Sequence, residues 1–502
     1  MEQHQTRVDE YLSIVNIRLG YNVLWNILGS TLPLIAGVVA VPLLLHGMGD
    51  ARLGVFTLAL GLIGFSGLFD LGLGRALTQM VASEQGKGTP SGAIAGLARK
   101  ALAALFLLGL FWGAMLWWAA PFLAKRLFSL EDMLAQETIA GLRWIALSLP
   151  FALVSAGLIG ILEGLQRFLL INTIRIPLGI VFFMAPALTA LGIPDVDAVI
   201  GTLAVTRIIA FLIWLFALLR VFVLFESDTH IKLHAGPLIR FSSWLTVSNI
   251  VGPLMVYADR FYLASLFPPA TVALYTVPFD TAFRATTLPL AAVNALFPAL
   301  AHAHSQPAQA ASFVLRAGQL MLLLWLPPIL VAMLLAQEVL TVWLNLEFAK
   351  QAAAILQWLL LGVFVNGFAH VPYAVLQSAG RSDITAKLHL FELPLYGGLI
   401  LSLVAIFGIL GAAIAWTARV FLDTVLLFLL AVKVESHHAD GLYNTELLVA
   451  AGVLTLGIAM MIHPLEVRWT IVILIILATV GIMWRFGIHL LPRLKENTDH
   501  AH

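Results

Sequence analysis

Apolar runs of about twenty residues recur along the whole chain, and short polar segments separate them. A helix needs about 20 apolar residues to cross the hydrocarbon core of a bilayer, so each run predicts a transmembrane helix. The pattern predicts an all-α integral membrane protein of about 14 transmembrane helices. The predicted spans are residues 21–45, 53–83, 97–124, 141–162, 170–192, 198–224, 238–266, 271–300, 312–336, 352–378, 385–408, 411–432, 446–463 and 468–490.

Composition agrees with this pattern, because 61% of the 502 residues are hydrophobic and only 11% are charged. Soluble domains average about 25% charged residues. The chain has no cysteine, which excludes disulfides, thiol catalysis and cysteine-ligated metals. The net charge of +1 gives no reason to expect a nucleic-acid partner. The N-terminal MEQHQTRVDEYLSIV lacks the layout of a cleaved signal peptide, so we expect the first span to be retained as an anchor.

Lysine and arginine predict the orientation. With these spans, 17 of them fall on the side of the N-terminus, 6 fall on the opposite side, and 5 fall inside spans. Cytoplasmic loops carry the excess of positive charge. We therefore expect both termini to be cytoplasmic, as an even number of spans requires.

A weak internal repeat predicts the domain organisation. ARLGVFTLAL (51–60) aligns with ATVALYTVPF (270–279) at an offset of 219, and ILEGLQR (161–167) aligns with VLQSAGR (375–381) at an offset of 214. Each repeat would hold six spans and enter from the cytoplasm, which makes the repeats parallel. We predict two six-helix lobes, 1–235 and 236–435, around a central cavity. Residues 436–502 would add two further helices and a cytoplasmic tail.

Charged side chains inside the spans are the candidate functional residues, because an ionisable group at that depth faces a bundle interior or a wet cavity. A guanidinium stays charged and offers a fork of donors that matches the oxygens of a pyrophosphate. The five intramembrane arginines are Arg75, Arg207, Arg260, Arg284 and Arg419. As substrate-binding residues that line a cavity we single out Arg75, Arg260, Arg284 and Arg419.

Four aspartates in the same spans have two open interpretations. Each is either an ion-coupling group, which binds a proton or a sodium ion during transport, or a counter-ion of a nearby arginine. The four are Asp70, Asp259, Asp280 and Asp423. Asp280 and Asp423 each lie four residues from an arginine and share a helix face with it, at Arg284 and Arg419. Asp70 and Arg75 are five apart across a Gly-rich turn, whereas the adjacent Asp259 and Arg260 each need a partner on another helix.

Three stretches resemble the multidrug/oligosaccharidyl-lipid/polysaccharide exporter superfamily, and within it the O-antigen-type polysaccharide flippases. They are LGVFTLALGLIGFSGLFDLGLGRALTQMVA (53–82), ILEGLQRFLLIN (161–172) and VYADRFYLASLFPPATVALYTVPFD (256–280). The resemblance implies two lobes that alternate between inward-open and outward-open forms in the bacterial cytoplasmic membrane. It implies that the cargo is a polyprenyl-pyrophosphate-linked oligosaccharide. It also implies that the protein contacts membrane lipid and has other polysaccharide-assembly membrane proteins as partners. Fourteen helices also resemble the branch that flips the lipid-linked peptidoglycan precursor.

Two other classes remain open at this point. A drug–cation antiporter of the same superfamily would need a cavity dominated by carboxylates, and here arginine and acid are about balanced. An integral-membrane enzyme acting on lipid-linked sugars would need an acidic or histidine cluster on a sizeable loop, and the predicted loops are short. We therefore expect a transporter rather than an enzyme, with no catalytic residue, metal or cofactor.

Overall fold

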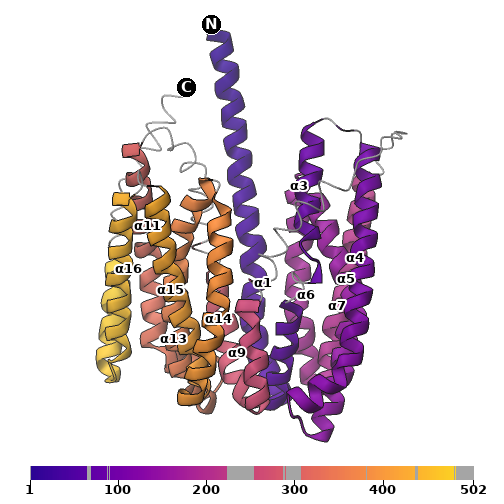
Figure 1. Ribbon diagram of the computed structural model, residues 1–502, viewed down its shortest axis with the longest axis vertical. Helices are drawn as coiled ribbons and strands as arrows, with labels where there is room; N and C mark the ends of the chain where they lie inside the picture. Colours follow the sequence, from indigo (N-terminus) through magenta and orange to yellow (C-terminus); the bar gives the residue numbers. More distant parts are fainter. Residues whose placement is uncertain are drawn as a thin grey trace. The chain divides into compact units, whose positions relative to one another are not determined.

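The computed structural model describes residues 2–64, 69–87, 89, 91–222, 251, 254–286, 289, 307–379, 381–435, 439–479 and 481. Every regular element in these ranges is a helix (Figure 1). They are α1 (Glu2–Gly64), α3 (Leu73–Gly86), α4 (Ser91–Phe122), the π-helix η1 (Leu123–Leu127), α5 (Asp132–Gly164), α6 (Phe168–Gly192), α7 (Val196–Phe222), α9 (Pro269–Arg284), α11 (Pro307–Leu334), α12 (Ala336–Trp343), α13 (Leu346–Ser378), α14 (Ser382–Phe407), α15 (Ile409–Val434) and α16 (Ala439–Met460). Residues 254–266 and 465–479 are helical as well.

Ten helices in the described ranges are long and apolar enough to cross a membrane. They confirm the all-helical, multi-pass fold class. The count of fourteen stays a prediction, because parts of the seventh, eighth and last predicted spans lie outside the described residues.

The second predicted span, 53–83, is not one continuous helix. α1 consists of two helical parts joined at Gly49, whose φ of 78° and ψ of 174° are not helical, and its second part ends at Gly64. Leu71 and Gly72 then have positive φ angles of 51° and 75°, and α3 begins at Leu73. Glycine takes up such angles without steric cost, which explains why the Gly-rich sequence turns here.

The division between the eleventh and twelfth predicted spans is confirmed. α14 ends at Phe407, α15 begins at Ile409, and the single residue between them is Gly408 with a φ of 59°. A left-handed glycine directly after a helix lets the chain reverse within one residue. The two helices therefore form a tight antiparallel hairpin, which Figure 1 shows as neighbouring orange ribbons.

The chain forms two compact units, Met1–Thr276 and Val277–His502. In the first unit α5 is the central helix, because it packs against α3, α4 and α7. In its most apolar 18-residue segment, 67% is buried. In the second unit the central helix is α13, which packs against α11, α15 and α16. In its most apolar 18-residue segment, 72% is buried. The predicted boundaries at 235 and 435 fall at or beside segments outside the described residues, so the domain organisation stays a prediction.

Candidate functional site

Asp70 lies in the turn that precedes α3, and its side chain is buried. Its Oδ1 accepts a hydrogen bond of 2.8 Å from the N–H of Gly72, and its carbonyl oxygen accepts one of 3.0 Å from Leu73. A carboxylate at this position binds N–H groups that the start of a helix leaves free. Arg75, in the first turn of α3, is exposed and adds an attractive charge. Asp70 thus shapes the turn that presents Arg75.

Asp259 and Arg260 are both buried, with 3% and 0% of their surface exposed. The Oδ1 of Asp259 accepts a 2.8 Å hydrogen bond from the backbone N–H of Arg260. Its Oδ2 accepts a short hydrogen bond from the hydroxyl of Tyr275 on α9. The expectation that Asp259 has a partner on another helix is therefore confirmed, although that partner is a tyrosine. Both carboxylate oxygens are engaged.

The side chain of Arg260 lies next to Gly61 of α1 and against the ring of Tyr257. Its Cζ is 4.9 Å from the centre of the Tyr257 ring, an arrangement typical of a cation–π contact. A Cβ atom at Gly61 would lie 3.2 Å from Cδ of Arg260, and one at Gly64 would lie 2.4 Å from Cζ of Tyr257. Small residues allow helices in a membrane to approach closely. Gly61 and Gly64 thus provide the space that Arg260 and Tyr257 fill.

One pair of residues related by the predicted repeat is in direct contact. Thr276 lies 219 residues after Thr57, which is the offset of the aligned segments. The hydroxyl of Thr276 donates a 2.8 Å hydrogen bond to that of Thr57, and both residues are buried. Both residues belong to the first compact unit, and the repeat itself stays a prediction.

Asp280 and Arg284 occupy the end of α9, where both are half-buried. Both make polar interactions, so neither is a free charge. Beside them Phe279 and Phe283 stack with ring centres 5.5 Å apart, and each meets the Trp416 ring of α15 edge-on. This aromatic contact anchors the end of α9 that carries both charges.

Arg419 is paired differently from the prediction, because its closest acidic partner is on a neighbouring helix. Its Nε and Nη2 atoms both lie 3.4 Å from Oε2 of Glu392 on α14, whose side chain is fully buried. The spacing of Arg419 and Asp423 on one helix suggested that these two residues pair. α14 packs along α15, however, and brings Glu392 to the guanidinium instead.

Asp423 lies in the same cluster, near two histidines. Its Oδ1 is 4.0 Å from Nε2 of His389 on α14, and its charge also acts on His370 of α13. Asp423 and Glu392 repel each other electrostatically. Within the described part of the chain, Oδ1 of Asp423 and Oε1 of Glu392 are buried and make no hydrogen bond. The second unit therefore brings two buried carboxylates, one arginine and two imidazoles into one cluster.

The sequence analysis missed Glu392 and His389. The available signal was an acid and an imidazole three residues apart within a span that is otherwise strongly apolar, in LHLFELPL. Residues at this spacing share a helix face. Buried acids need partners, so these two residues were candidates for the same reason as Asp423.

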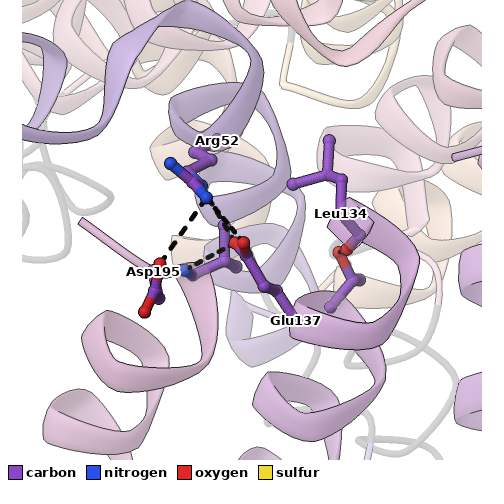
Figure 2. A network of polar contacts seen from close by, with 6 residues as sticks. Arg52, Leu134, Glu137 and Asp195 are labelled. Carbon is purple, nitrogen blue, oxygen red and sulfur yellow. Dashed lines mark hydrogen bonds and ion pairs between the residues drawn. The ribbon is translucent and has the colours of Figure 1, made fainter. Parts of the chain in front are cut away.

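A second ionic network lies at the side that the loop charges predict to be extracytoplasmic (Figure 2). Arg52 of α1 binds Glu137 of α5 through two hydrogen bonds of 2.9 and 2.6 Å, and its Nη2 lies 3.5 Å from Oδ1 of Asp195. Glu137 also accepts a 3.1 Å hydrogen bond from the N–H of Val196 at the start of α7. These contacts link α1, α5 and the start of α7 in the first unit, so their role is structural.

None of the described residues forms a group of three or more His, Asp or Glu side chains that could hold a metal ion. The expectation of no metal and no cofactor concerns the whole chain and stays a prediction.

The fold is that of transporters of the MOP superfamily, as the resemblance implied. The structure is similar to a multidrug resistance MATE family transporter of that superfamily in an inward-facing conformation, with a TM-score of 0.65 and 15% identity over 82% of this chain and 98% of the other. It is also similar to the lipid II flippase MurJ in an inward closed conformation, with a TM-score of 0.66 and 13% identity over 93% of this chain and 100% of the other. At these identities the likeness concerns the fold alone.

The chain belongs to the polysaccharide biosynthesis protein family, because the model of that family matches residues 19–304, more than half of its length. A Shigella flexneri protein assigned as an O-antigen transporter is 28% identical to it over 407 residues. That match covers 81% of this chain and 96% of the relative.

Proposed function

We propose that this protein is a flippase that moves a polyprenyl-pyrophosphate-linked oligosaccharide from the cytoplasmic to the outer leaflet by alternating access. The observation that carries the proposal is membership of the polysaccharide biosynthesis protein family, with a transporter relative matched over nearly its whole length. The similarity to a lipid flippase in fold supports it. The sugars and the pyrophosphate would cross between the two lobes while the lipid tail stays in the bilayer.

In this proposal the arginines bind the pyrophosphate and differ in accessibility. Arg75 is exposed and Arg284 is half-buried, so both can meet a polar headgroup in the present conformation. Arg260 is fully enclosed beneath Gly61 and shapes the wall of the site in this state. Arg419 is held near Glu392 and belongs to the ion-coupling cluster rather than to the cargo site.

The coupling ion in this proposal is a proton that the carboxylates of Glu392 and Asp423 share. Two carboxylates in an apolar interior repel each other, and a single proton between them removes a charge and supplies a hydrogen bond to an oxygen that lacks one. The nearby guanidinium of Arg419 disfavours a sodium ion, which would bring a further positive charge to the cluster. Asp259, whose two oxygens are engaged, acts as a counter-ion, and Asp70 holds its turn.

The same proposal places the protein in the bacterial cytoplasmic membrane with both termini cytoplasmic, beside other membrane proteins of polysaccharide assembly. It acts as a transporter and not as an enzyme. Rigid-body rocking of residues of about 15–225 against about 236–432 would alternate the access of the cargo.

The experiment that tests the function is translocation of a fluorescent polyprenyl-pyrophosphate oligosaccharide in proteoliposomes. Arg75→Ala and Arg284→Ala should lose most of the translocation, and Arg75→Lys should retain part of it because the charge remains. Arg99→Ala, which removes an exposed arginine of α4, is the matched control and should remain active. Efflux of a cationic dye without movement of the oligosaccharide would make the protein a drug antiporter. Full translocation by both alanine variants would contradict the site.

A further inference from the structure

A groove on the second unit has the lining of a lipid site, and none of its lining residues has a role in the function proposed above. It lies between α14 and α15, has a volume of about 730 Å³, and is open on one side. Pockets that hold small molecules span about 300–1,000 Å³. The groove is lined by Arg381, Ile384, Lys387, Leu388, Phe391, Leu426, Leu430, Lys433 and Val434.

Charge and apolar surface are separated along this groove. The three cations belong to the first turns of α14 and the last turn of α15, so they gather at one end of the hairpin. The apolar residues continue along both helices away from that end, and Phe391 leaves 63% of its surface exposed. A lipid has the same arrangement, with a charged headgroup at one end and hydrocarbon beyond it.

The cationic end keeps a net positive charge. Asp383 binds Arg381 at 3.0 Å and Lys387 at 3.1 Å. With Glu435, which follows Val434 at the end of α15, three positive charges stand against two negative charges. Both pairs are at the surface, where such ion pairs contribute little and exchange partners easily. The N-terminus of α14 also lies at this end, and the dipole of a helix favours an anion at its N-terminus.

The position of these cations relative to the membrane fits a lipid headgroup. The loop charges predict this end of the hairpin to be cytoplasmic, and anionic lipids give that leaflet a negative surface potential. Lys387 is one turn inside the span, and 72% of its side chain is exposed. A lysine there can extend its ammonium group to the headgroup level while its stem stays in the apolar layer.

We propose that this groove binds an acidic glycerophospholipid of the bilayer, with the phosphate between Arg381, Lys387 and Lys433 and an acyl chain along Phe391, Leu426 and Leu430. Two of the three cations are lysines, and the Nε of the one guanidinium is engaged by Asp383. The site thus offers point charges rather than the free fork that best recognises a pyrophosphate. The lipid joins the beginning of α14 to the end of α15 and stabilises the hairpin that carries Glu392 and Asp423.

Lipid binding by the purified full-length protein in detergent tests this proposal without any transport assay. Phosphatidylglycerol is titrated against phosphatidylcholine of the same chain length, and bound lipid is measured by native mass spectrometry together with the thermal unfolding midpoint. We expect phosphatidylglycerol to bind selectively and to raise the midpoint. Lys387→Gln with Lys433→Gln should weaken its binding about 25-fold, since each surface cation contributes about fivefold.

Two further variants keep the test decisive. Lys125→Gln with Lys350→Gln removes the same charge from exposed positions on the opposite predicted side and should leave binding unchanged. Leu430→Trp fills the groove while keeping all three cations, and it should abolish selective binding.

Three results would overturn the proposal: equal binding of both lipids, tight binding of inorganic phosphate alone, or a clear preference for polyprenyl pyrophosphate over phosphatidylglycerol at these residues. The last result would make the groove a cargo site. Loss of oligosaccharide translocation alone would concern the proposed function and leave this lipid site standing.

Discussion

The buried Asp259 of the first unit and the buried Asp423 of the second unit have opposite surroundings. Asp259 accepts hydrogen bonds on both oxygens, from Arg260 and Tyr275. Asp423 lies 4.0 Å from its histidine neighbour, and in the described part of the chain its Oδ1 makes no hydrogen bond. A carboxylate whose oxygens both accept hydrogen bonds is held in place, whereas a buried oxygen that accepts none still has room for a donor. Burial alone therefore does not distinguish these two carboxylates, whereas their hydrogen-bond partners do.

The largest expected effect is on the stability of the cluster of Asp259, Arg260 and Tyr275 in the first unit. Asp259→Ala removes the acceptor of two buried hydrogen bonds, from the Tyr275 hydroxyl and from the backbone N–H of Arg260. A hydrogen bond to a charged group contributes about 1.5–3 kcal/mol, so we expect a loss of about 3–6 kcal/mol in stability. Unfolding in a denaturing detergent titration measures it. Asp259→Asn, which keeps an acceptor for the tyrosine hydroxyl, should lose less. Equal stability of Asp259→Ala and the parent protein would remove the distinction between the clusters.

Substitution of Gly64 or Gly61 on α1 should have the next largest effect on stability. Gly64→Ala places a Cβ 2.4 Å from the Tyr257 ring, a rigid neighbour, and overpacking of this kind costs about 1–3 kcal/mol. Gly61→Ala meets the flexible stem of Arg260 at 3.2 Å and should cost less, so it is the matched control. The same unfolding titration compares them, and a reversed order would show that Arg260 is the more rigid side chain.

The cluster of Glu392, Arg419 and Asp423 in the second unit should tolerate the loss of one acid. The cluster around Asp259 should not. Glu392→Gln removes one of two repelling carboxylates and keeps a side-chain oxygen that can accept from Arg419, so we expect stability to change by no more than about 1 kcal/mol. Transport should lose its response to an imposed pH gradient, measured in proteoliposomes. Asp423→Asn should behave alike. Destabilisation as large as that of Asp259→Ala would mean that this cluster is structural too.

The smallest effect concerns the hydrogen bond between the hydroxyls of Thr57 and Thr276. Hydrogen bonds between membrane helices average about 0.6 kcal/mol, which is the coupling expected between Thr57 and Thr276. A double-mutant cycle of Thr57→Val and Thr276→Val measures it. Strict additivity of the two substitutions would show that the bond contributes nothing.

The sequence by itself determined the membrane class, most of the helices and the turns between them. Apolar runs define spans because lipid leaves backbone groups no other partners. The turns at Gly72 and Gly408 are local, since only glycine readily takes up their positive φ angles. The charged residues Asp259, Arg260, Arg419 and Asp423 were also evident, because a charge stands out in an apolar span.

Only the tertiary structure decided which partner each charge has. Helical spacing relates residues on one helix, so it suggested Arg419 with Asp423 and gave no access to Glu392 on α14. Tyr275 reaches Asp259, and Gly61 makes room for Arg260, because particular helix faces pack against each other. Packing also brings Lys433 to the groove that Arg381 and Lys387 line, although Lys433 is far from both in sequence. Partners across helices depend on packing of the whole unit, which no single segment encodes.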